Sequence, residues 1–422
     1  MTHVFMSGEN GDFNYGDQGM ALASVDRLRC YLPDLSITAT AGYPKTSVLF
    51  PIAKKIVPWP QPKPLRLTWI QRALKHLRLL QTINLSQHFE KSFQETYAQD
   101  ELFRATIMDL EKAAFVFDMG HGGINDIFGR ILPYFYWLSH RLNKPLFISG
   151  KSIGPITDTS LIDAYRMSMK HAHTVILRDA ELSKQILMNT IKIKDSVRLV
   201  EAGDDTFDLA SVEPDWSKLP TDLKKTIVSQ NFFAIQWRPT DYTKTFSFEV
   251  YELLVSQITK LNSHFGLQPV FVPMSWESRA DIAAAVMLDT MLPEETRFLI
   301  IPTNIGARAT KWILGQAQFG LGLSYHFHIW LLSQGHPSIG IYTNPYYQVK
   351  ITGAFRALGY NMPPINLVDL SQGTETLPLT VIENWDEVES SKLIDSATRL
   401  AQTWHLAFRD FLKDIGIVSD TP

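Results

Sequence analysis

The sequence predicts an α/β protein made of two Rossmann-like halves that face a cleft, with a helix closing the chain. At 422 residues the chain exceeds what one hydrophobic core usually organises, so two domains are expected. Short apolar runs alternate with amphipathic segments, which is typical of a parallel sheet with helical crossovers. The alternation stops at a polar, proline-bearing stretch, residues 210–230, and then starts again.

The first half shows the strand–helix alternation from its first residues. A strand at 3–8 precedes a helical spacing of apolar residues over 15–32 and a second strand at 35–42. Four more short apolar runs each end in glycine or a polar residue, at 113–120, 144–155, 173–179 and 196–205. Ligands of such sheets bind at the carboxyl ends of the strands, where these polar residues lie.

The second half repeats the alternation after the expected linker at 210–230. Strands are predicted at 232–239, 267–275, 297–304, 317–324, 336–343 and 366–369, and helices over 247–265, 278–291 and 385–415. The expected domains are therefore residues 1–210 and residues 228–422, the second with the closing helix.

A basic insertion interrupts the first half at 54–81. It holds seven Lys and Arg residues and no acidic residue. Its proline-rich part is expected to be a loop, and the part from Leu65 onward places apolar residues on one helical side. Two interpretations stay open: a surface for a membrane or an anionic substrate, or a core-facing helix with a solvated basic face.

Composition narrows the class of function. Charged residues make up 20% of the chain and the formal net charge is −3, whereas a general nucleic-acid-binding protein is usually basic. Cys30 is the only cysteine, so neither an intrachain disulfide nor a thiolate zinc site is expected. No secretory signal and no apolar run of about eighteen residues are visible. We expect a cytoplasmic protein without nucleic-acid partners.

Two glycine-bearing turns follow predicted strands and are candidates for a ligand site. In the first, Asn14 and Asp17 can cap the next helix and Gly16 allows close packing, while an acid there can accept a sugar hydroxyl proton. In the second, Gly122 and Gly123 let backbone N–H groups approach an anion or a sugar. A tight turn without a ligand would carry the same residues.

Two histidines and two cations mark the second half. In an extended chain His326 and His328 would point to one face, as candidates for gripping an anion or for acid–base work. One buried structural histidine beside an exposed one is the alternative. Arg238 and Lys350 could reach the same cleft. No carboxylate or third histidine at ligand spacing accompanies the pair, so no metal is expected. The Gly-Lys-Ser at 150–152 lacks the earlier glycine of a nucleotide-phosphate loop.

Taken in order, these segments resemble the polysaccharide pyruvyl transferase family. The family's Asn-x-Gly-Asp is matched by residues 14–17, its glycine-rich turn by 120–123 and its Ser-Ile-Gly-Pro by 152–155. The later motifs are Arg-Asp with a following Ser, Asp-x-Phe, Ser-x-Arg-x-His, Gly-x-Pro, Tyr-x-x-Lys-x-x-Gly and Leu-Gly. They correspond to residues 178–183, 205–207, 324–328, 335–337, 347–353 and 358–359.

The resemblance implies a GT-B-type fold and transfer of a pyruvyl ketal from phosphoenolpyruvate to sugar hydroxyls. It implies a glycan or lipid-linked glycan acceptor and a role in exopolysaccharide or other cell-surface glycan synthesis. A peripheral position at the inner face of the membrane would suit such an acceptor. Phosphoenolpyruvate would be a co-substrate, and no resident cofactor is expected. No signature of an oligomeric state is present.

The resemblance places His328 at the donor, and we add further candidate residues, with the first domain on the acceptor side and the second on the donor side. The catalytic candidates are Asp17, as the base at the acceptor, and His328, at the donor. The donor-binding candidates are Lys151, Ser152, Arg238, His326 and Lys350. The acceptor-side candidates are Asn14, Gly16, Gly122, Gly123 and Arg178.

One departure from the family pattern bears on the donor. His326 stands where the family has arginine, which binds carboxylate or phosphate in a fork, whereas neutral histidine offers one donor. Losing the fork would cost about 1.5–3 kcal/mol of donor binding unless His326 is protonated or another cation compensates. Lys151, at a position where glutamine is expected, is one such cation. The alternatives are a GT-B glycosyltransferase that uses a nucleotide-sugar and a catalytically silent glycan-binding relative.

Overall fold

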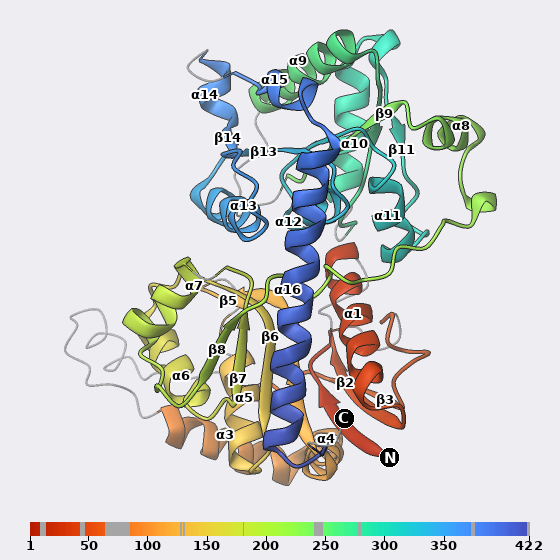
Figure 1. The fold of residues 1–422 in the computed structure, drawn as a ribbon. Helices are drawn as coiled ribbons and strands as arrows, with labels where there is room; N and C mark the ends of the chain where they lie inside the picture. The colour runs from red at the N-terminus through yellow and green to blue at the C-terminus, as the bar shows by residue number, and fades with distance from the viewer. Residues whose placement is uncertain are drawn as a thin grey trace. The chain divides into compact units, whose positions relative to one another are not determined.

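In the computed structural model, the described residues are 1–8, 14–42, 47–63, 85–126, 129, 131–179, 181–239, 248–276, 280–372 and 376–419. The chain divides into two compact units (Figure 1). Unit 1 comprises Met1–Asn10, Ser24–Ala202 and Trp404–Pro422, and unit 2 comprises Gly11–Ala23 and Gly203–Thr403. The expected domains are continuous stretches of chain, whereas each unit combines separate stretches.

The sheet of unit 1 is parallel throughout its described strands. Its order is β3-β2-β1-β4-β6-β7-β8, with β5 paired to β6. The chain runs outward from β1 to β3 and resumes at β4 on the other side of β1, which makes a switch point between β1 and β4. The strands are β1 (Thr2–Met6), β2 (Leu35–Ala41), β3 (Lys55–Pro58), β4 (Phe115–Asp118), β5 (His121–Ile124), β6 (Leu146–Ile153), β7 (Thr174–Leu177) and β8 (Arg198–Glu201).

Helices follow the strands of unit 1 in the manner of βαβ units. They are α3 (Leu85–Gln99), α4 (Glu101–Lys112), α5 (Ile131–Arg141), α6 (Thr159–Met169), α7 (Glu181–Gln185) and the π-helix η1 (Ile186–Ile191). Two helices contribute residues to both units. They are α1 (Tyr15–Tyr31), which belongs to unit 1 from Ser24 onward, and α16 (Glu387–Asp414), which belongs to unit 1 from Trp404 onward.

Neighbouring residues of β4 point to opposite faces of the sheet in unit 1. Phe115 packs against Phe411 of α16 and Phe117 against Phe408, with ring centroids 5.3 and 6.0 Å apart. Val116, between them, joins the apolar cluster that includes side chains of α3 to α6. This alternation is the period of two of a strand buried on both faces, which places the last turns of the closing helix over the unit 1 sheet.

Unit 2 repeats the parallel design with a second switch point. Its sheet order is β11-β10-β9-β12-β13-β14, so the switch point lies between β9 and β12. The strands are β9 (Phe232–Gln236), β10 (Gln268–Phe271), β11 (Leu299–Ile300), β12 (Gly320–Gly322), β13 (Ser338–Tyr342) and β14 (Ile365–Asn366). Its core is a separate apolar cluster that also takes in Tyr15 and Ala23 of α1.

The helices of unit 2 connect its strands and lead to the closing helix. They are η2 (Trp216–Lys218), α8 (Thr221–Ser229), α9 (Phe248–Phe265), α10 (Ala280–Met291), η4 (Glu294–Thr296), α11 (Ala307–Leu314), α12 (Tyr325–Leu332), α13 (Pro345–Ala357), α14 (Leu367–Ser371) and α15 (Leu379–Glu383). The predicted strands of both halves and the closing helix are therefore confirmed, apart from the corrections that follow.

Three local predictions were wrong. The expected linker at 210–230 contains α8, because Leu223 and Ile227, four residues apart, are buried on one helical face. The strand expected at 366–369 ends at Asn366, whose side chain accepts from Val368 N and caps α14. The expected loop of the basic insertion contains β3, which pairs with β2. The remainder of that insertion, from residue 64, lies outside the described residues.

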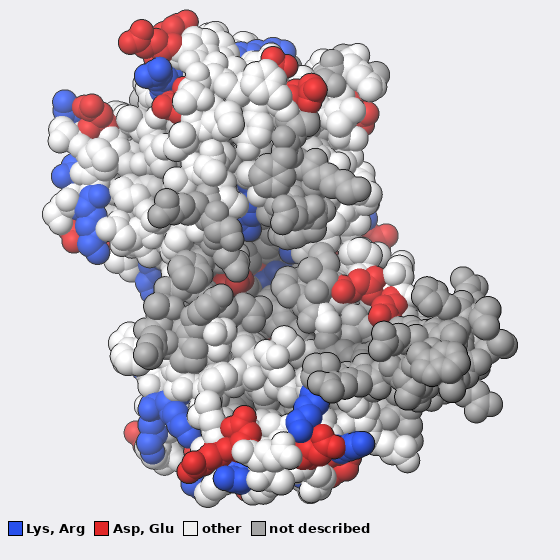
Figure 2. All heavy atoms as spheres, turned by 180° about the vertical axis from the view of Figure 1, so that it is seen from behind, with Lys and Arg blue, Asp and Glu red and all other residues white. Residues whose placement is uncertain are grey.

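The described surface carries charges of both signs. Figure 2 shows Lys and Arg side chains interspersed with Asp and Glu on this face of each unit. Several form ion pairs in unit 1, such as Arg141 with Glu90 at 2.8 Å and Lys63 with Glu95 at 3.1 Å. No helix in the described ranges has the length and apolar character that crossing a membrane requires.

Candidate active site

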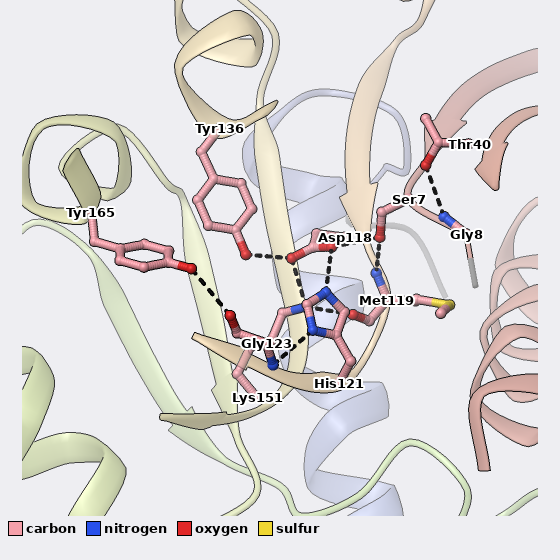
Figure 3. Close-up of polar contacts among 10 residues, drawn as sticks. All are labelled: Ser7, Gly8, Thr40, Asp118, Met119, His121, Gly123, Tyr136, Lys151 and Tyr165. Carbon is pink, nitrogen blue, oxygen red and sulfur yellow. Dashed lines mark hydrogen bonds and ion pairs between the residues drawn. The ribbon is translucent and has the colours of Figure 1, made fainter. Parts of the chain in front are cut away.

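The carboxyl ends of the strands in unit 1 meet around Asp118, the last residue of β4. Ser7, which follows β1 across the switch point, donates from Oγ to Asp118 Oδ1 at 2.5 Å. Lys151 of β6 reaches Oδ2 with its Nζ at 2.7 Å. Figure 3 shows these side chains together with the rest of the surroundings of Asp118. Open α/β sheets bind ligands at these carboxyl ends of the strands.

Two further side chains complete the surroundings of the Asp118 carboxylate. Tyr136 of α5 donates from its hydroxyl to Oδ2 at 2.5 Å, and Nε2 of His121 in β5 lies 3.6 Å from Oδ1. Asp118 and Lys151 are both fully buried. A buried charge is tolerated only when it is paired and hydrogen-bonded, and this carboxylate has both kinds of support. We call Ser7, Asp118, His121, Tyr136 and Lys151 the Asp118 cluster.

The pKa values in the Asp118 cluster define its charges. Burial alone would raise the pKa of Asp118, but the Lys151 ammonium, helped by His121, lowers it well below the usual range. Burial together with the Lys151 charge lowers the pKa of His121 to about 4. At neutral pH the cluster therefore holds an ionised carboxylate, an ammonium and a neutral imidazole.

The predicted residues Gly122, Gly123, Lys151, Ser152 and Arg178 all lie in unit 1, within or beside this cluster. The glycines are in β5 and Ser152, which is half-buried, is in β6. Arg178 follows β7, is 2% exposed, and donates from its backbone N–H to Lys151 O at 3.0 Å. Lys151 and Ser152, expected on the donor side, thus share a unit with predicted acceptor-side residues.

The carboxyl ends of the strands in unit 2 meet around a second buried aspartate, Asp281 of α10. Arg238, which follows β9, donates from Nε to Asp281 Oδ1 at 2.8 Å. Oδ2 accepts from Gln236 Nε2 at 3.1 Å and from the backbone N–H groups of Met274 and Ser275, each at 2.9 Å. The Arg238 side chain keeps 13% of its surface exposed.

Gln236 joins this network to the start of α12. Its Oε1 accepts from the backbone N–H of Ser324 at 2.7 Å, directly before the helix that carries both predicted histidines. Because Gln236 is fully buried and bonded at both ends, it fixes the position of the α12 amino terminus relative to Asp281 and Arg238.

The segment that opens the first predicted motif belongs to unit 2. Asn14 forms an antiparallel bridge with Ser275, and its Oδ1 accepts from Gly16 N at 2.8 Å, which begins α1. A Cβ at position 16 would lie 2.1 Å from Nδ1 of His326, so the packing there requires glycine. Asp17 is half-buried in the first turn of α1, where the helix dipole favours a negative charge.

The loop that follows β8 also contacts His326. Its Nε2 lies 3.6 Å from Oδ2 of Asp204, which is fully buried. The other carboxylate oxygen accepts from the backbone N–H and hydroxyl of Thr206, at 2.8 and 2.6 Å. Lys311 of α11 donates to the carbonyls of residues 206, 207 and 209, at 2.8, 3.1 and 2.9 Å. His326 therefore faces an aspartate on a firmly held loop.

His328 occupies a different environment from His326. The expectation that both would project from one face was wrong, because they lie in α12 rather than in an extended chain, and residues two apart on a helix point to opposite sides. His328 is fully buried, and its Nδ1 lies 2.7 Å from Ser338 Oγ. Burial lowers its pKa to about 3. His328 is thus neutral at physiological pH.

Lys350 lies on α13, and none of the hydrogen bonds described for the Asp281 network involves its side chain. Its Nζ donates to the hydroxyl of Tyr346, one helical turn earlier, at 2.9 Å and lies 4.7 Å from the centre of that ring. The structure therefore joins Asn14, Gly16 and His326 directly, and Arg238 through Gln236 and Asp281.

Sequence reasoning missed the two aspartates at the centres of these networks. Asp118 could have been noticed in the sequence, because an acid that ends the apolar strand "FVFD" needs a partner for its charge at the carboxyl end of that strand. Asp281 carried no such signal, since it stands in the first turn of an ordinary helix and meets its partners only through the fold. No group of three or more metal-ligating side chains occurs within the described part of the chain.

Comparisons with known proteins bear on the family and the fold. A family model described as polysaccharide pyruvyl transferase matches residues 14–345. Among solved structures, the chain resembles the S. aureus MnaA–UDP structure at 10% identity, with 100% of this chain and 99% of that chain covered and a TM-score of 0.57. It resembles UDP-GlcNAc 2-epimerase from Neisseria meningitidis bound to UDP-GlcNAc at 10% identity, with 98% and 100% covered and a TM-score of 0.54.

A plant enzyme shows the same likeness. A UDP-glucosyltransferase from Polygonum tinctorium is 12% identical, with 98% of each chain covered and a TM-score of 0.53. At these identities the likeness concerns the fold alone. That fold is GT-B, as found in glycosyltransferases and epimerases, and it agrees with the two parallel sheets described above.

Proposed function

Because the chain belongs to the polysaccharide pyruvyl transferase family, a family of transferases, we propose that it moves a pyruvyl group from phosphoenolpyruvate to a glycan or glycan precursor. One observation carries the proposal beyond the family name. The first and a late motif of the matched region pack together in unit 2, where Gly16, beside Asp17, contacts His326. The proposal assigns the reaction to this contact.

The proposed reaction balances without a further reactant. The methylene carbon of phosphoenolpyruvate takes up a proton, one acceptor hydroxyl adds to the neighbouring carbon, and phosphate leaves with the electrons of its C–O bond. A second hydroxyl of the same sugar adds to the oxocarbenium-like carbon and completes the ketal. Of the two hydroxyl protons released, one replaces the proton taken up by the methylene carbon and the other leaves with phosphate.

The residues of unit 2 suit these steps. Asp17 is the proposed base for an acceptor hydroxyl, since it is half-buried and lies next to the His326 contact. Arg238 is the proposed main contact for the donor's charged groups, because its guanidinium is held in place by Asp281 through Nε and Nη2 while 13% of the side-chain surface is exposed. His326 is the proposed second contact, in place of arginine.

The two remaining donor candidates take lesser parts in the proposal. Lys350 adds positive charge on α13. His328, being fully buried, supports the first turns of α12 rather than touching the donor. The proposed acceptor is a cell-surface glycan, such as an exopolysaccharide or its lipid-linked precursor, and the proposed site of reaction is the cytoplasm or the inner face of the membrane.

Phosphate release from phosphoenolpyruvate tests the proposal. Galactose-, mannose- and glucuronate-terminated acceptors are each incubated with the donor, and the product is analysed for the added ketal by mass spectrometry. We expect acceptor-dependent release with at least one acceptor and its loss in Asp17→Asn and Arg238→Gln. Arg297→Gln is the matched control. Arg297 is exposed in the same unit and precedes β11, so it lies at the amino ends of the strands, whereas Arg238 follows β9 at their carboxyl ends.

Calorimetry of phosphoenolpyruvate binding shows how a failure to release phosphate should be interpreted. The proposal requires that phosphoenolpyruvate bind to the wild-type protein and to Arg297→Gln but more weakly to Arg238→Gln. Absence of binding to the wild type, together with turnover of UDP-glucose on the same acceptors, would replace pyruvyl transfer by glycosyl transfer. His326→Arg is expected to bind the donor more tightly, by about tenfold or more, if His326 lies at the donor.

A further inference from the structure

The segment from Met119 to Gly123, which follows β4 and includes the first three residues of β5, is held through its backbone by side chains. We call this segment the Met119–Gly123 turn. The bonds are Ser7 Oγ with Met119 N at 2.8 Å, Lys151 Nζ with Met119 O at 2.6 Å, Asn125 Nδ2 with Gly122 O at 2.6 Å, His121 Nδ1 with Gly123 N at 2.9 Å and the Tyr165 hydroxyl with Gly123 O at 3.2 Å. Figure 3 shows most of these contacts around the Asp118 cluster. A segment with so many partners is confined to one conformation, because moving it would break several buried bonds together.

The turn also passes directly over the imidazole of His121. A Cβ at Gly123 would lie 2.4 Å from both Nδ1 and Cε1 of that ring. Glycine is needed here for close approach, and the approach lets Nδ1 accept the Gly123 N–H. The position of the glycines therefore depends on the orientation and the protonation state of His121.

His121 can accept from Gly123 only as a neutral imidazole. With Nδ1 as acceptor, the proton is on Nε2, which faces Asp118. An imidazolium would carry protons on both nitrogens, and Nδ1 would then repel the Gly123 N–H. The charged groups that face His121 are Asp118 of β4, Lys151 of β6 and Arg178 after β7. Asp118 favours the imidazolium, whereas Lys151 and Arg178 oppose it.

Lys151 thus does two things that no neutral residue could do. It neutralises a buried carboxylate whose other neighbours are two hydroxyls and a neutral imidazole, and it opposes protonation of the imidazole that holds Gly123. A glutamine at this position, as the family resemblance predicts, could donate hydrogen bonds from its amide but would leave Asp118 without its counter-ion. The Lys151 Nζ pairs with the Asp118 carboxylate and donates to Met119 O, and the Lys151 side chain has no exposed surface.

We propose that Lys151 is a positioning residue for the acceptor: through Asp118, His121 and the Met119 carbonyl it fixes the Met119–Gly123 turn, so that the half-buried Gly122 can present its backbone to an acceptor sugar. Its role is then on the acceptor side and not in compensating for a missing donor arginine. The identity of the acceptor as a glycan rests on the proposed function, whereas the fixing of the turn does not.

Lys151→Gln tests the proposal, with Lys112→Gln, an exposed lysine at the end of α4, as the matched control. Three measurements are made: exchange of the Gly123 amide hydrogen, NMR titration of His121, and KM for acceptor and donor separately. In Lys151→Gln we expect exchange at Gly123 about tenfold faster and a higher pKa for His121. We also expect KM for the acceptor to rise by about tenfold or more, while KM for phosphoenolpyruvate stays within about twofold.

The outcomes separate this proposal from the proposed function. Exchange and titration need no turnover, so a chain that does not use phosphoenolpyruvate still supports or overturns the positioning role. Unchanged exchange and titration in folded Lys151→Gln would overturn it, and so would a rise confined to KM for the donor. If Lys151→Gln does not fold, the charge-neutral double variant Asp118→Asn/Lys151→Gln decides, since it too lacks the Nζ bond to Met119. Slow exchange at Gly123 in that variant would contradict the proposal.

Discussion

Both units bury an aspartate near the carboxyl ends of the strands of a parallel sheet, and the two carboxylates are neutralised differently. Asp118 of unit 1 is surrounded by an ammonium, two hydroxyl groups and a neutral imidazole at 3.6 Å, all from side chains. Asp281 of unit 2 receives two backbone N–H groups and a glutamine amide as well as a guanidinium. One centre therefore depends on a single counter-ion, whereas the other spreads the charge over fixed dipoles.

The cations of the two centres differ in access to solvent. Lys151 has no exposed side-chain surface, while the Arg238 side chain is 13% exposed. A guanidinium offers five N–H donors and can serve a buried carboxylate and a ligand together, which an enclosed ammonium cannot. The buried carboxylate of unit 1 is thus paired with an enclosed cation, and that of unit 2 with a cation that is partly exposed.

The largest expected effect is on stability and separates Asp118→Asn from Asp281→Asn. The first leaves the Lys151 ammonium buried without a counter-ion and should destabilise unit 1 by about 3–5 kcal/mol. The second leaves Arg238 partly exposed, so it should destabilise unit 2 by roughly 1–3 kcal/mol. Peptide-resolved hydrogen exchange measures each unit separately. Equal losses in the two variants would show that the centres do not differ as described.

The next effect concerns ligand binding and uses a substitution that keeps the charge. Arg238→Lys retains a cation beside Asp281 but loses the planar donor set, so kcat/KM for phosphoenolpyruvate should fall about 10- to 100-fold, an effect of roughly 1.5–3 kcal/mol. The stability of unit 2 should change little, because the backbone donors to Asp281 remain. Undiminished kcat/KM would place the donor's charged groups elsewhere.

The sheets were predictable because strands in this fold are apolar runs with polar ends. The β4 segment "FVFD" is buried on both faces and reads as continuous apolar sequence, and the closing helix has a long amphipathic spacing. Assignment of residues 11–23 to unit 2 was not predictable, since it follows from contacts such as Asn14 with Ser275 that join distant parts of the chain.

The candidate site was predictable in its residue types and less so in its geometry. The motif order pointed to His326 and Asp17, and both lie in unit 2 near the same glycine. The orientation of His328 was missed because the residues around the two histidines in "YHFHIWLL" are apolar or aromatic and show no helical period, so a buried helix was indistinguishable from a strand. The partners of Lys151 were missed because a buried ion pair has no local signature.

A third prediction compares the fully buried His328 of unit 2 with His121 of unit 1, whose side chain is 17% exposed, under acid. Burial lowers the pKa of His328 to about 3, and burial with Lys151 lowers that of His121 to about 4, both from 6.5. A histidine with a lowered folded-state pKa contributes stability that is present above pH 6.5 and is lost as pH falls toward the folded value, because the unfolded chain then binds more protons. Each should contribute up to about 1.4 kcal/mol of loss per pH unit.

Urea unfolding between pH 7.5 and 5 checks this, followed by exchange in each unit. His328→Gln should reduce the pH dependence of unit 2 alone, and His121→Gln that of unit 1 alone, while other histidines with lowered pKa values, such as His336 in unit 2 and His171 in unit 1, keep part of it. A slope in unit 2 that is the same with and without His328 would mean that this side chain can reach a proton without unfolding, and the buried assignment would then fail.

The smallest expected effect distinguishes two hydroxyl groups within unit 1. Tyr136 donates to the Asp118 carboxylate at 2.5 Å, whereas Tyr165 donates to the Gly123 carbonyl at 3.2 Å. A hydrogen bond to an ionised acceptor is the stronger of the two, so Tyr136→Phe should destabilise unit 1 by about 1 kcal/mol more than Tyr165→Phe. Both rings are fully buried, so the loss of apolar packing is matched between the variants. Because Tyr136→Phe leaves Lys151 in place, a difference near zero would show that the ammonium alone sustains the carboxylate, and that the single counter-ion sets unit 1 apart from unit 2 even more sharply.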